Sequence, residues 1–243
     1  MFEIGERRSD YPTGKKRKTL IVRRAWLFAF TAFLATPALA ADEDTQAWIA
    51  ANATIGVSKN IVVWLEGQAR FTDNVGNLGQ VLFRPGVGLK LGPNTTAYVG
   101  YAYIHTDPPG PAKSNEHRAW QQLSFRIAGN GKGLTVTGRS RLEQRWIEGA
   151  NDMGWRYRQQ LRLTAPIGGK VRGVAWSEAF IALDDTSWGQ RSGIDRWRNF
   201  VGVAVPVSKT VTVEPGYLNQ YVVRQGAADR IHHVASFTLS AKF

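Results

Sequence analysis

The chain has 243 residues, a formal net charge of +12 and no cysteine. The lack of cysteine excludes a disulfide scaffold and thiolate metal sites. A basic chain can indicate nucleic-acid binding, but the first forty residues hold eight basic and three acidic side chains, and without them the charge falls to +7. Five of the twelve net positive charges therefore belong to this one end, and we expect no nucleic-acid partner.

Residues 1–40 have the order of a secretory signal peptide. A basic stretch, 15–24, precedes a short apolar run from Ala25 to Leu34, and Ala38-Leu39-Ala40 supplies the small residues of a cleavage site. The run is short for a membrane-spanning helix, and the acidic residues after Ala40 are unlike a stop-transfer flank, which disfavours a retained membrane anchor. We expect residues 1–40 to be a signal peptide with an extended N-terminus.

From Gln46 onward the sequence alternates between apolar and polar residues, which is the pattern of strands with two different faces. Turn-forming residues interrupt it about every dozen positions. Eleven segments result: 46–57, 61–73, 79–91, 96–106, 117–128, 133–147, 154–166, 171–184, 195–206, 211–224 and 230–243.

Short links alternate with longer ones along this series, as they do between the two ends of outer-membrane barrels. The sequence predicts an all-β fold: a transmembrane antiparallel up-and-down β-barrel of about 10–12 strands over residues 41–243, preceded by the cleavable signal peptide. Single-chain bacterial barrels have even strand numbers, which favours ten or twelve over the eleven segments counted.

A soluble β-sandwich or a soluble closed barrel would also show alternation. Here the apolar face mixes small and large residues, and aromatic residues such as Phe71, Trp146, Trp155, Trp197 and Tyr221 stand near strand ends, as in the interfacial girdle of membrane barrels. The polar face is rich in arginine. We predict that it lines the lumen with Glu66, Arg70, Arg84, Arg118, Arg126, Arg139, Arg141, Glu143, Arg145, Arg156, Arg158, Arg162, Glu178, Arg196, Arg198 and Glu214.

The last strand carries an independent localisation signal. Phe237, Leu239 and Phe243 share one face with small residues, and the opposite face is polar. This pattern resembles the C-terminal targeting strand of outer-membrane proteins, which typically ends in phenylalanine. We therefore expect export to the outer membrane of a Gram-negative bacterium, contact with outer-membrane lipid and lipopolysaccharide, and recognition of this strand by the barrel-assembly machinery.

Several stretches resemble the domain of unknown function 2490 family of outer-membrane barrels. The resemblance covers nearly all of the chain after Ala40 but implies no activity, since the family is uncharacterised. It rests on residues 44–48 (DTQAW), 66–71 (EGQARF), 82–88 (LFRPGVG), 139–145 (RSRLEQR), 156–158 (RYR) and 214–221 (EPGYLNQY).

The residues give little support to an enzyme. Outer-membrane lipid hydrolases need a nucleophile and an activating base, and the best candidate is His117 beside Glu116 and Ser114. None of the four histidines lies in a Gly-x-Ser-x-Gly motif. His232 and His233 point to opposite strand faces, and Asp184, Asp185 and Asp195 are most simply solvated carboxylates. We expect no catalytic residue, metal or cofactor.

The arginine-rich face leaves two main interpretations. Its arginines attract anions through a narrow, anion-leaning pore, or they pair with the carboxylates and fill the barrel as an envelope structural protein. Alternatives are an outer-membrane lipid hydrolase, and a barrel that contacts lipopolysaccharide phosphates through loop-side Arg118, Arg156 and Arg196. The sequence indicates no solute and no oligomeric state.

Overall fold

The computed structural model describes Met1, residues 42–110 and residues 112–243. The predicted signal peptide with its cleavage site at Ala38 and Ala40 lies outside the described residues, apart from Met1. The strands are β1 Asp42–Gly56, β2 Ile61–Thr72, β3 Asn77–Gly92, β4 Thr95–Thr106, β5 Ser114–Ala128, β6 Thr135–Ile147, β7 Met153–Gly168, β8 Val171–Ala182, β9 Gly193–Pro206, β10 Val211–Val222 and β11 Arg230–Lys242. No helix among these residues is long and apolar enough to cross a membrane.

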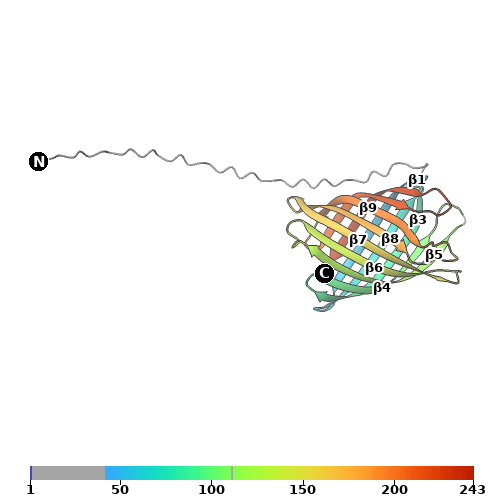
Figure 1. Cartoon of the computed structure of the whole chain (residues 1–243), viewed down its shortest axis with the longest axis horizontal. Coiled ribbons are helices and arrows are strands. Elements are labelled where there is room, and N and C mark those ends of the chain that lie inside the picture. Colours follow the sequence, from blue (N-terminus) through green and yellow to red (C-terminus); the bar gives the residue numbers. More distant parts are fainter. Residues whose placement is uncertain (2–41, 111) are drawn as a thin grey trace. The chain divides into compact units, whose positions relative to one another are not determined.

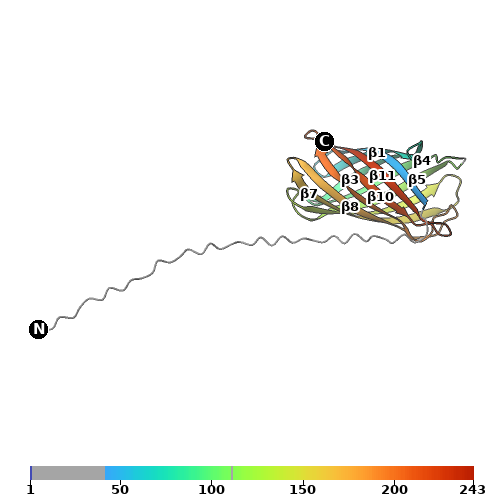
Figure 2. The ribbon, with the colours of Figure 1, turned by 90° about the horizontal axis from the view of Figure 1, so that it is seen from above.

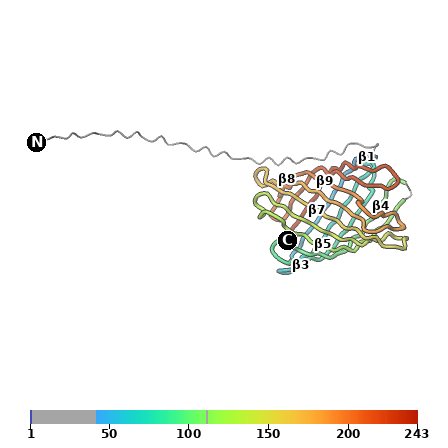
Figure 3. Tube along the Cα trace, in the orientation of Figure 1, coloured from blue at the N-terminus to red at the C-terminus, as the bar shows by residue number. Residues whose placement is uncertain are grey.

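The strands form a single sheet that closes on itself as a barrel (Figure 1). Consecutive strands pair antiparallel, and the tube in Figure 3 follows the chain up and down the wall. The all-β barrel prediction is therefore confirmed, and a two-sheet sandwich is excluded.

The ring closes between β1 and β11, which lie side by side in Figure 2. This pair is parallel and runs in unbroken register from Asp42 opposite Arg230 to Thr54 opposite Lys242. The inference that the strand number would be even is wrong for the described residues. With eleven strands alternating in direction, the first and last strands point the same way, so the closing pair must be parallel. We call this pair the seam.

The connections divide the barrel into two rims. The turn rim holds the links 57–60, 93–94, 129–134, 169–170 and 207–210, whereas the loop rim holds 73–76, 107–113, 148–152, 183–192 and 223–229. Because β1 and β11 are parallel, Asp42 lies at the loop rim and Lys242 at the turn rim. The chain therefore enters and leaves the sheet at opposite ends.

The two faces of the wall differ in chemistry, as the alternation predicted. The outward face carries exposed apolar side chains at mid-strand positions such as Val99 and Val201, which are 60% and 59% exposed. Phe237, Leu239 and Phe243 of the predicted targeting strand are also exposed. Inward positions carry buried polar and charged groups, among them Gln46, Glu143 and Glu178.

Two apolar clusters pack inside opposite parts of the wall. One contains Trp48, Val174, Phe200, Leu218 and Val234, and the other contains Leu82, Ala102, Ile104 and Trp120. Both clusters narrow the space left for the charged groups.

The interior aromatic rings lie on glycine backbone, which gives the strand glycines a packing role. A Cβ atom added at Gly100 would stand 2.4 Å from Trp120 Cζ2 and 2.4 Å from the Pro85 carbonyl oxygen. Trp120 is 1% exposed, so its ring has no free space to move into. Gly86 is closed off by the same ring, and Phe200 occupies the corresponding place over Gly202 and Gly216.

We expect Gly100→Ala to lower the free energy of unfolding by about 1–3 kcal/mol, because the added methyl group overpacks the wall. The measurement is denaturant unfolding of the detergent-folded barrel. Gly67→Ala is the matched control, since a Cβ at this strand glycine meets no atom within 4 Å. Equal unfolding midpoints for the two variants would contradict the packing role.

Candidate functional site

The interior of the barrel holds a cluster of charged side chains contributed by β2, β3 and β5 to β10. Eleven arginines face six carboxylates there, which leaves an excess of positive charge. The arginines are 70, 84, 118, 139, 141, 145, 156, 158, 162, 196 and 198, and the carboxylates are Glu66, Glu116, Glu143, Glu178, Asp195 and Glu214. We call this set the interior cluster.

Glu143 is the centre of the interior cluster and is 1% exposed. Its carboxylate accepts hydrogen bonds from Arg156 Nη2 at 2.7 Å and Arg158 Nη1 at 2.8 Å. Arg141 and Arg118 lie at 3.7 and 4.0 Å. Four guanidinium groups from three strands therefore surround one carboxylate. Its negative charge offsets the repulsion among these four buried cations.

Further carboxylates extend these contacts around the wall. Glu178 accepts from Arg139 at 2.8 Å and lies 2.9 Å from Arg158, so it links β6, β7 and β8. Glu116 accepts from Arg118 Nε at 2.6 Å and from Arg145 Nε at 2.5 Å. These are charge-assisted hydrogen bonds, the strongest kind that side chains make. The Glu116 group borders the Glu143 group, because Arg118 also lies 4.0 Å from Glu143.

The remaining carboxylates each bind nearby arginines. Glu66 accepts from Arg84 at 2.8 Å, Asp195 from Arg156 at 3.0 Å, and Glu214 pairs with Arg162. Glu116 and Asp195 are the two members that sequence reasoning did not assign to the interior. Extending the alternation of β5 by two residues would have placed Glu116 beside Arg118 on the inward face.

Two arginines of the cluster lack a carboxylate. Among the residues that the structure describes, Arg70 and Arg198 alone of the eleven have no carboxylate oxygen within 4.0 Å. Both guanidinium groups face the Trp48 ring, with Cζ at 4.0 Å and 4.8 Å from its centroid. Arg126, which was also predicted to line the lumen, lies exposed at the turn rim and lines a separate cavity there.

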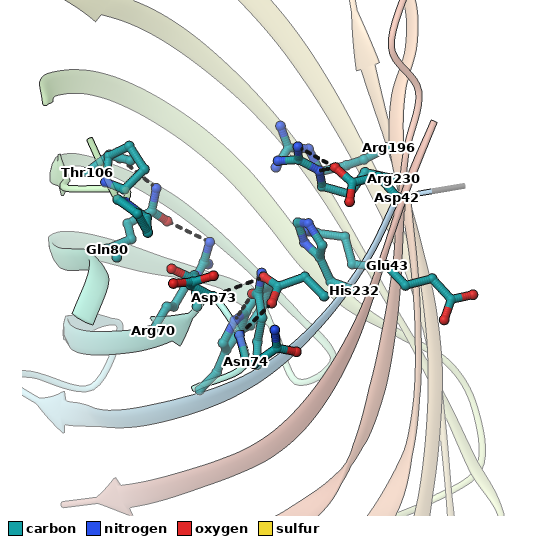
Figure 4. Close-up of a pocket in the computed structure, with 18 residues that line it drawn as sticks. Asp42, Glu43, Arg70, Asp73, Asn74, Gln80, Thr106, Arg196, Arg230 and His232 are labelled. Atoms are coloured by element: carbon teal, nitrogen blue, oxygen red, sulfur yellow. Dashed lines mark hydrogen bonds and ion pairs between the residues drawn. The ribbon is translucent and has the colours of Figure 1, made fainter. Parts of the chain in front are cut away.

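Three cavities follow one another through the barrel. The first, of about 480 Å³, opens at the loop rim, where Arg70, Gln80, Arg196 and His232 line it (Figure 4). The second, of about 290 Å³, lies among the interior cluster. The third, of about 370 Å³, opens at the turn rim.

Neighbouring cavities share walls. The first and second have Trp48, Arg70, Gln80 and Arg196 in common, and the second and third have Arg139 and Gln160 in common. The shared side chains lie between adjacent cavities, so each cavity borders the next.

The loop rim is held in place by hydrogen bonds to aspartates. Asp44 of β1 accepts from the backbone of Asn74 at 2.9 Å, and residues 73–75 are in the left-handed region, with φ of 55°, 51° and 67°. Left-handed backbone is unfavourable for a β-branched residue such as Val75, so these contacts hold a strained loop over the first cavity.

A second contact ties two loops together. Asp152 accepts from Ser187 N at 2.6 Å and from Ser187 Oγ at 2.7 Å, and these bonds hold the pKa of its carboxyl below the usual value. Because the charged form is the one stabilised, the link is present at neutral pH and is lost as the pH falls through that lowered pKa.

His117 lies on the outer wall, on the opposite strand face from Glu116. Its ring bonds to Tyr101 and, through Nε2, to Glu148 at 3.0 Å. Within the described part of the chain, no serine or threonine hydroxyl bonds to it. A similar pair, Tyr217 and His233 at 2.7 Å, lies on the outward face of β10 and β11.

The other histidine and aspartate candidates are separated by their partners. His232 lines the first cavity whereas His233 faces outward, as the strand alternation implies. Asp184 accepts from Trp155 N and Asp185 from Ser192 N, while Asp195 pairs with arginines. No group of three or more potential metal ligands occurs within residues 42–110 and 112–243.

The chain matches the model of one protein family. The model of a protein family of unknown function, DUF2490, matches residues 45–232. The chain belongs to this family. The resemblance inferred from the sequence motifs is thus confirmed, and nearly all of the described barrel falls within the family's extent.

One curated relative and one solved structure are also similar to the chain. An uncharacterised protein of Methylorubrum extorquens strain AM1 is 36% identical over 224 residues, covering 89% of this chain and 97% of that protein. The structure of the porin NanC aligns with a TM-score of 0.47 and 13% identity, covering 77% of this chain and 93% of the porin.

Proposed function

We propose that this family member is a non-enzymatic protein of the Gram-negative outer membrane whose barrel forms a narrow passage that favours anions. The observation that carries the proposal is a cavity at each rim and a third between them, among an interior cluster that has more arginines than carboxylates. Excess fixed positive charge along a narrow path raises the local concentration of anions and repels cations.

The outward face supports placement in a bilayer. Large apolar side chains are exposed around the wall, for example Phe83, Val87, Leu161 and Val201. A soluble monomer rarely exposes contiguous apolar patches of more than a few hundred Å², whereas a membrane barrel needs an apolar band facing lipid. Trp146, Trp197 and Tyr221 are exposed near the loop rim, where an interfacial aromatic girdle would lie.

The proposal includes export and assembly. The predicted signal peptide would direct secretion, and the outward residues Phe237, Leu239 and Phe243 of β11 would present the targeting strand to the barrel-assembly machinery. Contact with lipid, including lipopolysaccharide, would involve the apolar outer wall. Arg118 and Arg156 point into the interior cluster, so they do not support phosphate binding from the lipid side.

Reconstitution into a planar bilayer tests the passage. We expect unitary currents, and under a salt gradient a reversal potential of the sign that indicates anion preference. A cation preference would contradict the role of the arginine excess. If the folded protein inserted but gave no unitary current, the passage would be rejected in favour of a closed envelope structural barrel.

A lipid hydrolase is the less supported alternative. The hydrogen-bonded group of Tyr101, His117 and Glu148 on the outer wall is the observation in its favour. It provides a base and an orienting carboxylate, but the described residues place no serine or threonine nucleophile on His117. The geometry therefore favours the non-enzymatic proposal.

A further inference from the structure

The junction between the first and second cavities has a chemistry of its own. Its shared lining consists of Trp48, Arg70, Gln80 and Arg196, and Arg198 joins it from the second cavity. A solute that moves from the first cavity into the second would contact these side chains. The junction is therefore where the passage would select what enters.

Arg70 is fixed at this junction by neutral groups. Its Nη1 donates to Gln80 Oε1 at 2.7 Å (Figure 4). Its Nε donates to Gln68 Oε1, also at 2.7 Å, and its guanidinium lies over Trp48. Amide oxygens and an indole ring orient the guanidinium without neutralising it. Within the described residues, Nη2 donates to no protein atom, so this edge keeps a free N–H group beside a full positive charge.

Arg198 has the same kind of environment. Its Nε donates to Gln220 Oε1 at 2.7 Å, and its guanidinium lies 4.8 Å from the Trp48 centroid and 4.6 Å from the Phe180 centroid. Both of its terminal nitrogens are without a hydrogen-bond acceptor in the described part of the protein. Two rigidly held guanidinium groups thus share one indole ring and present unused donors to the cavities.

This contrasts with the rest of the interior cluster. The other nine arginines each have a carboxylate within 4.0 Å, as Arg84 has Glu66 and Arg139 has Glu178. The charge of each is therefore offset by a nearby carboxylate, although Nε of Arg84, Nε of Arg139 and Nη1 of Arg141 have no hydrogen-bond partner in the described residues. Arg70 and Arg198 instead have no carboxylate within 4.0 Å in the described residues, and both line the second cavity, where Arg198 is 7% exposed.

We propose that Arg70 and Arg198 form a binding site for a small oxyanion, a carboxylate or a phosphate group, at the junction of the first two cavities. The planar guanidinium fork matches the paired oxygens of these groups, which a spherical halide lacks. The second cavity, of about 290 Å³, is at the small end of ligand-sized pockets. The site rests on the proposed function only in that solutes reach it through the passage.

Calorimetric titration of the folded full-length barrel in detergent tests the site. Inorganic phosphate and acetate are the probes, and chloride is the comparison anion. We expect saturable binding of phosphate and acetate that is at least tenfold tighter than that of chloride, and a further loss of about tenfold or more in Arg70→Gln and in Arg198→Gln. Lys209→Gln, which removes one charge at the exposed turn 207–210, is the matched control and should bind as the unaltered protein does.

Lysine variants separate charge from geometry and guard against misfolding. Arg70→Lys and Arg198→Lys keep the charge but lose the fork, so phosphate should bind them more weakly than the unaltered protein and more tightly than the glutamine variants. Heat-dependent gel mobility confirms that each variant is closed. Equal phosphate affinity in folded Arg70→Gln, Arg198→Gln and Lys209→Gln would overturn the site, as would no measurable phosphate binding by the unaltered protein.

The bilayer recording distinguishes this failure from failure of the passage. Anion-selective currents that Arg70→Gln and Arg198→Gln leave unchanged would retain the passage and reject the site. Phosphate binding that depends on both arginines, without any unitary current, would retain the site and reject the passage.

Discussion

Glu143→Gln is expected to lower the free energy of unfolding by about 3–5 kcal/mol, the usual loss when one partner of a buried ion pair is removed. The substitution keeps the shape of the side chain and removes only its charge. Arg156 and Arg158 then lose the carboxylate at 2.7 and 2.8 Å. Arg141 loses the carboxylate at 3.7 Å, and Arg118 loses one at 4.0 Å but keeps Glu116. Mutual repulsion among these buried cations is what destabilises the barrel.

Denaturant unfolding in detergent measures this loss, with Glu148→Gln as the control. Glu148 also accepts two hydrogen bonds, from Asn115 and His117, but its side chain is 52% exposed. Exposed pairs contribute about 0–1 kcal/mol, so the control should change little. Adding Arg156→Gln to Glu143→Gln should recover part of the stability, since it removes one unbalanced charge. A Glu143→Gln effect no larger than that of Glu148→Gln would show that the cluster is solvated rather than braced by its carboxylates.

Val201→Arg is expected to destabilise the barrel in a bilayer by about 2–4 kcal/mol, the cost of an arginine at the membrane midplane. Val201 lies in the middle of β9, faces outward and is 59% exposed, with Tyr217 and Ala175 as its neighbours on adjacent strands. The same change on a water-exposed wall would cost within about 0.5 kcal/mol. The loss of stability in Val201→Arg therefore tells whether lipid or water surrounds the outer face of the barrel.

The control is Val207→Arg at the turn rim, on the same hairpin. Val207 is 61% exposed, but near the interface an arginine costs only about 0–1 kcal/mol. Unfolding of both variants is compared in lipid vesicles. If the two variants were equally stable in vesicles, the lipid-facing assignment of mid-wall residues would be wrong.

The sequence predicted the strands of the barrel wall better than the way in which the barrel closes between β1 and β11. All eleven alternating segments are strands, because a half-buried wall imposes a period of two on every strand. The start of β1 was placed at Gln46, whereas the strand begins at Asp42, since the acidic residues there carry no alternating apolar signal. The parallel seam was missed because the rule of even strand numbers was preferred to the eleven segments counted, and an odd number of alternating strands can close only in parallel.

The interior cluster was only partly predictable, because alternation gives the face on which a residue lies but not its neighbours on adjacent strands. Alternation identifies which residues face inward, such as Arg70 and Glu143. It does not reveal that Gln80 meets Arg70, or that Gln220 meets Arg198, because those contacts depend on hairpin register. Glu116 was considered as a neighbour of His117 in the chain, yet the two point to opposite faces of β5. Sequence adjacency thus misled where strand geometry separates side chains.

The parallel seam also has a consequence for the order of folding. Its contacts join residues as far apart as Asp42 and Arg230, which are 188 positions apart, whereas the other strand pairs are neighbours along the chain. Neighbouring strands can therefore pair one after another along the chain, but the barrel can close only when β11 is present to pair with β1. Until then β1 keeps an open edge of unpaired backbone groups, the kind of edge that recruits other chains. Closure of the seam is thus the step that turns a growing curved sheet into a self-contained molecule.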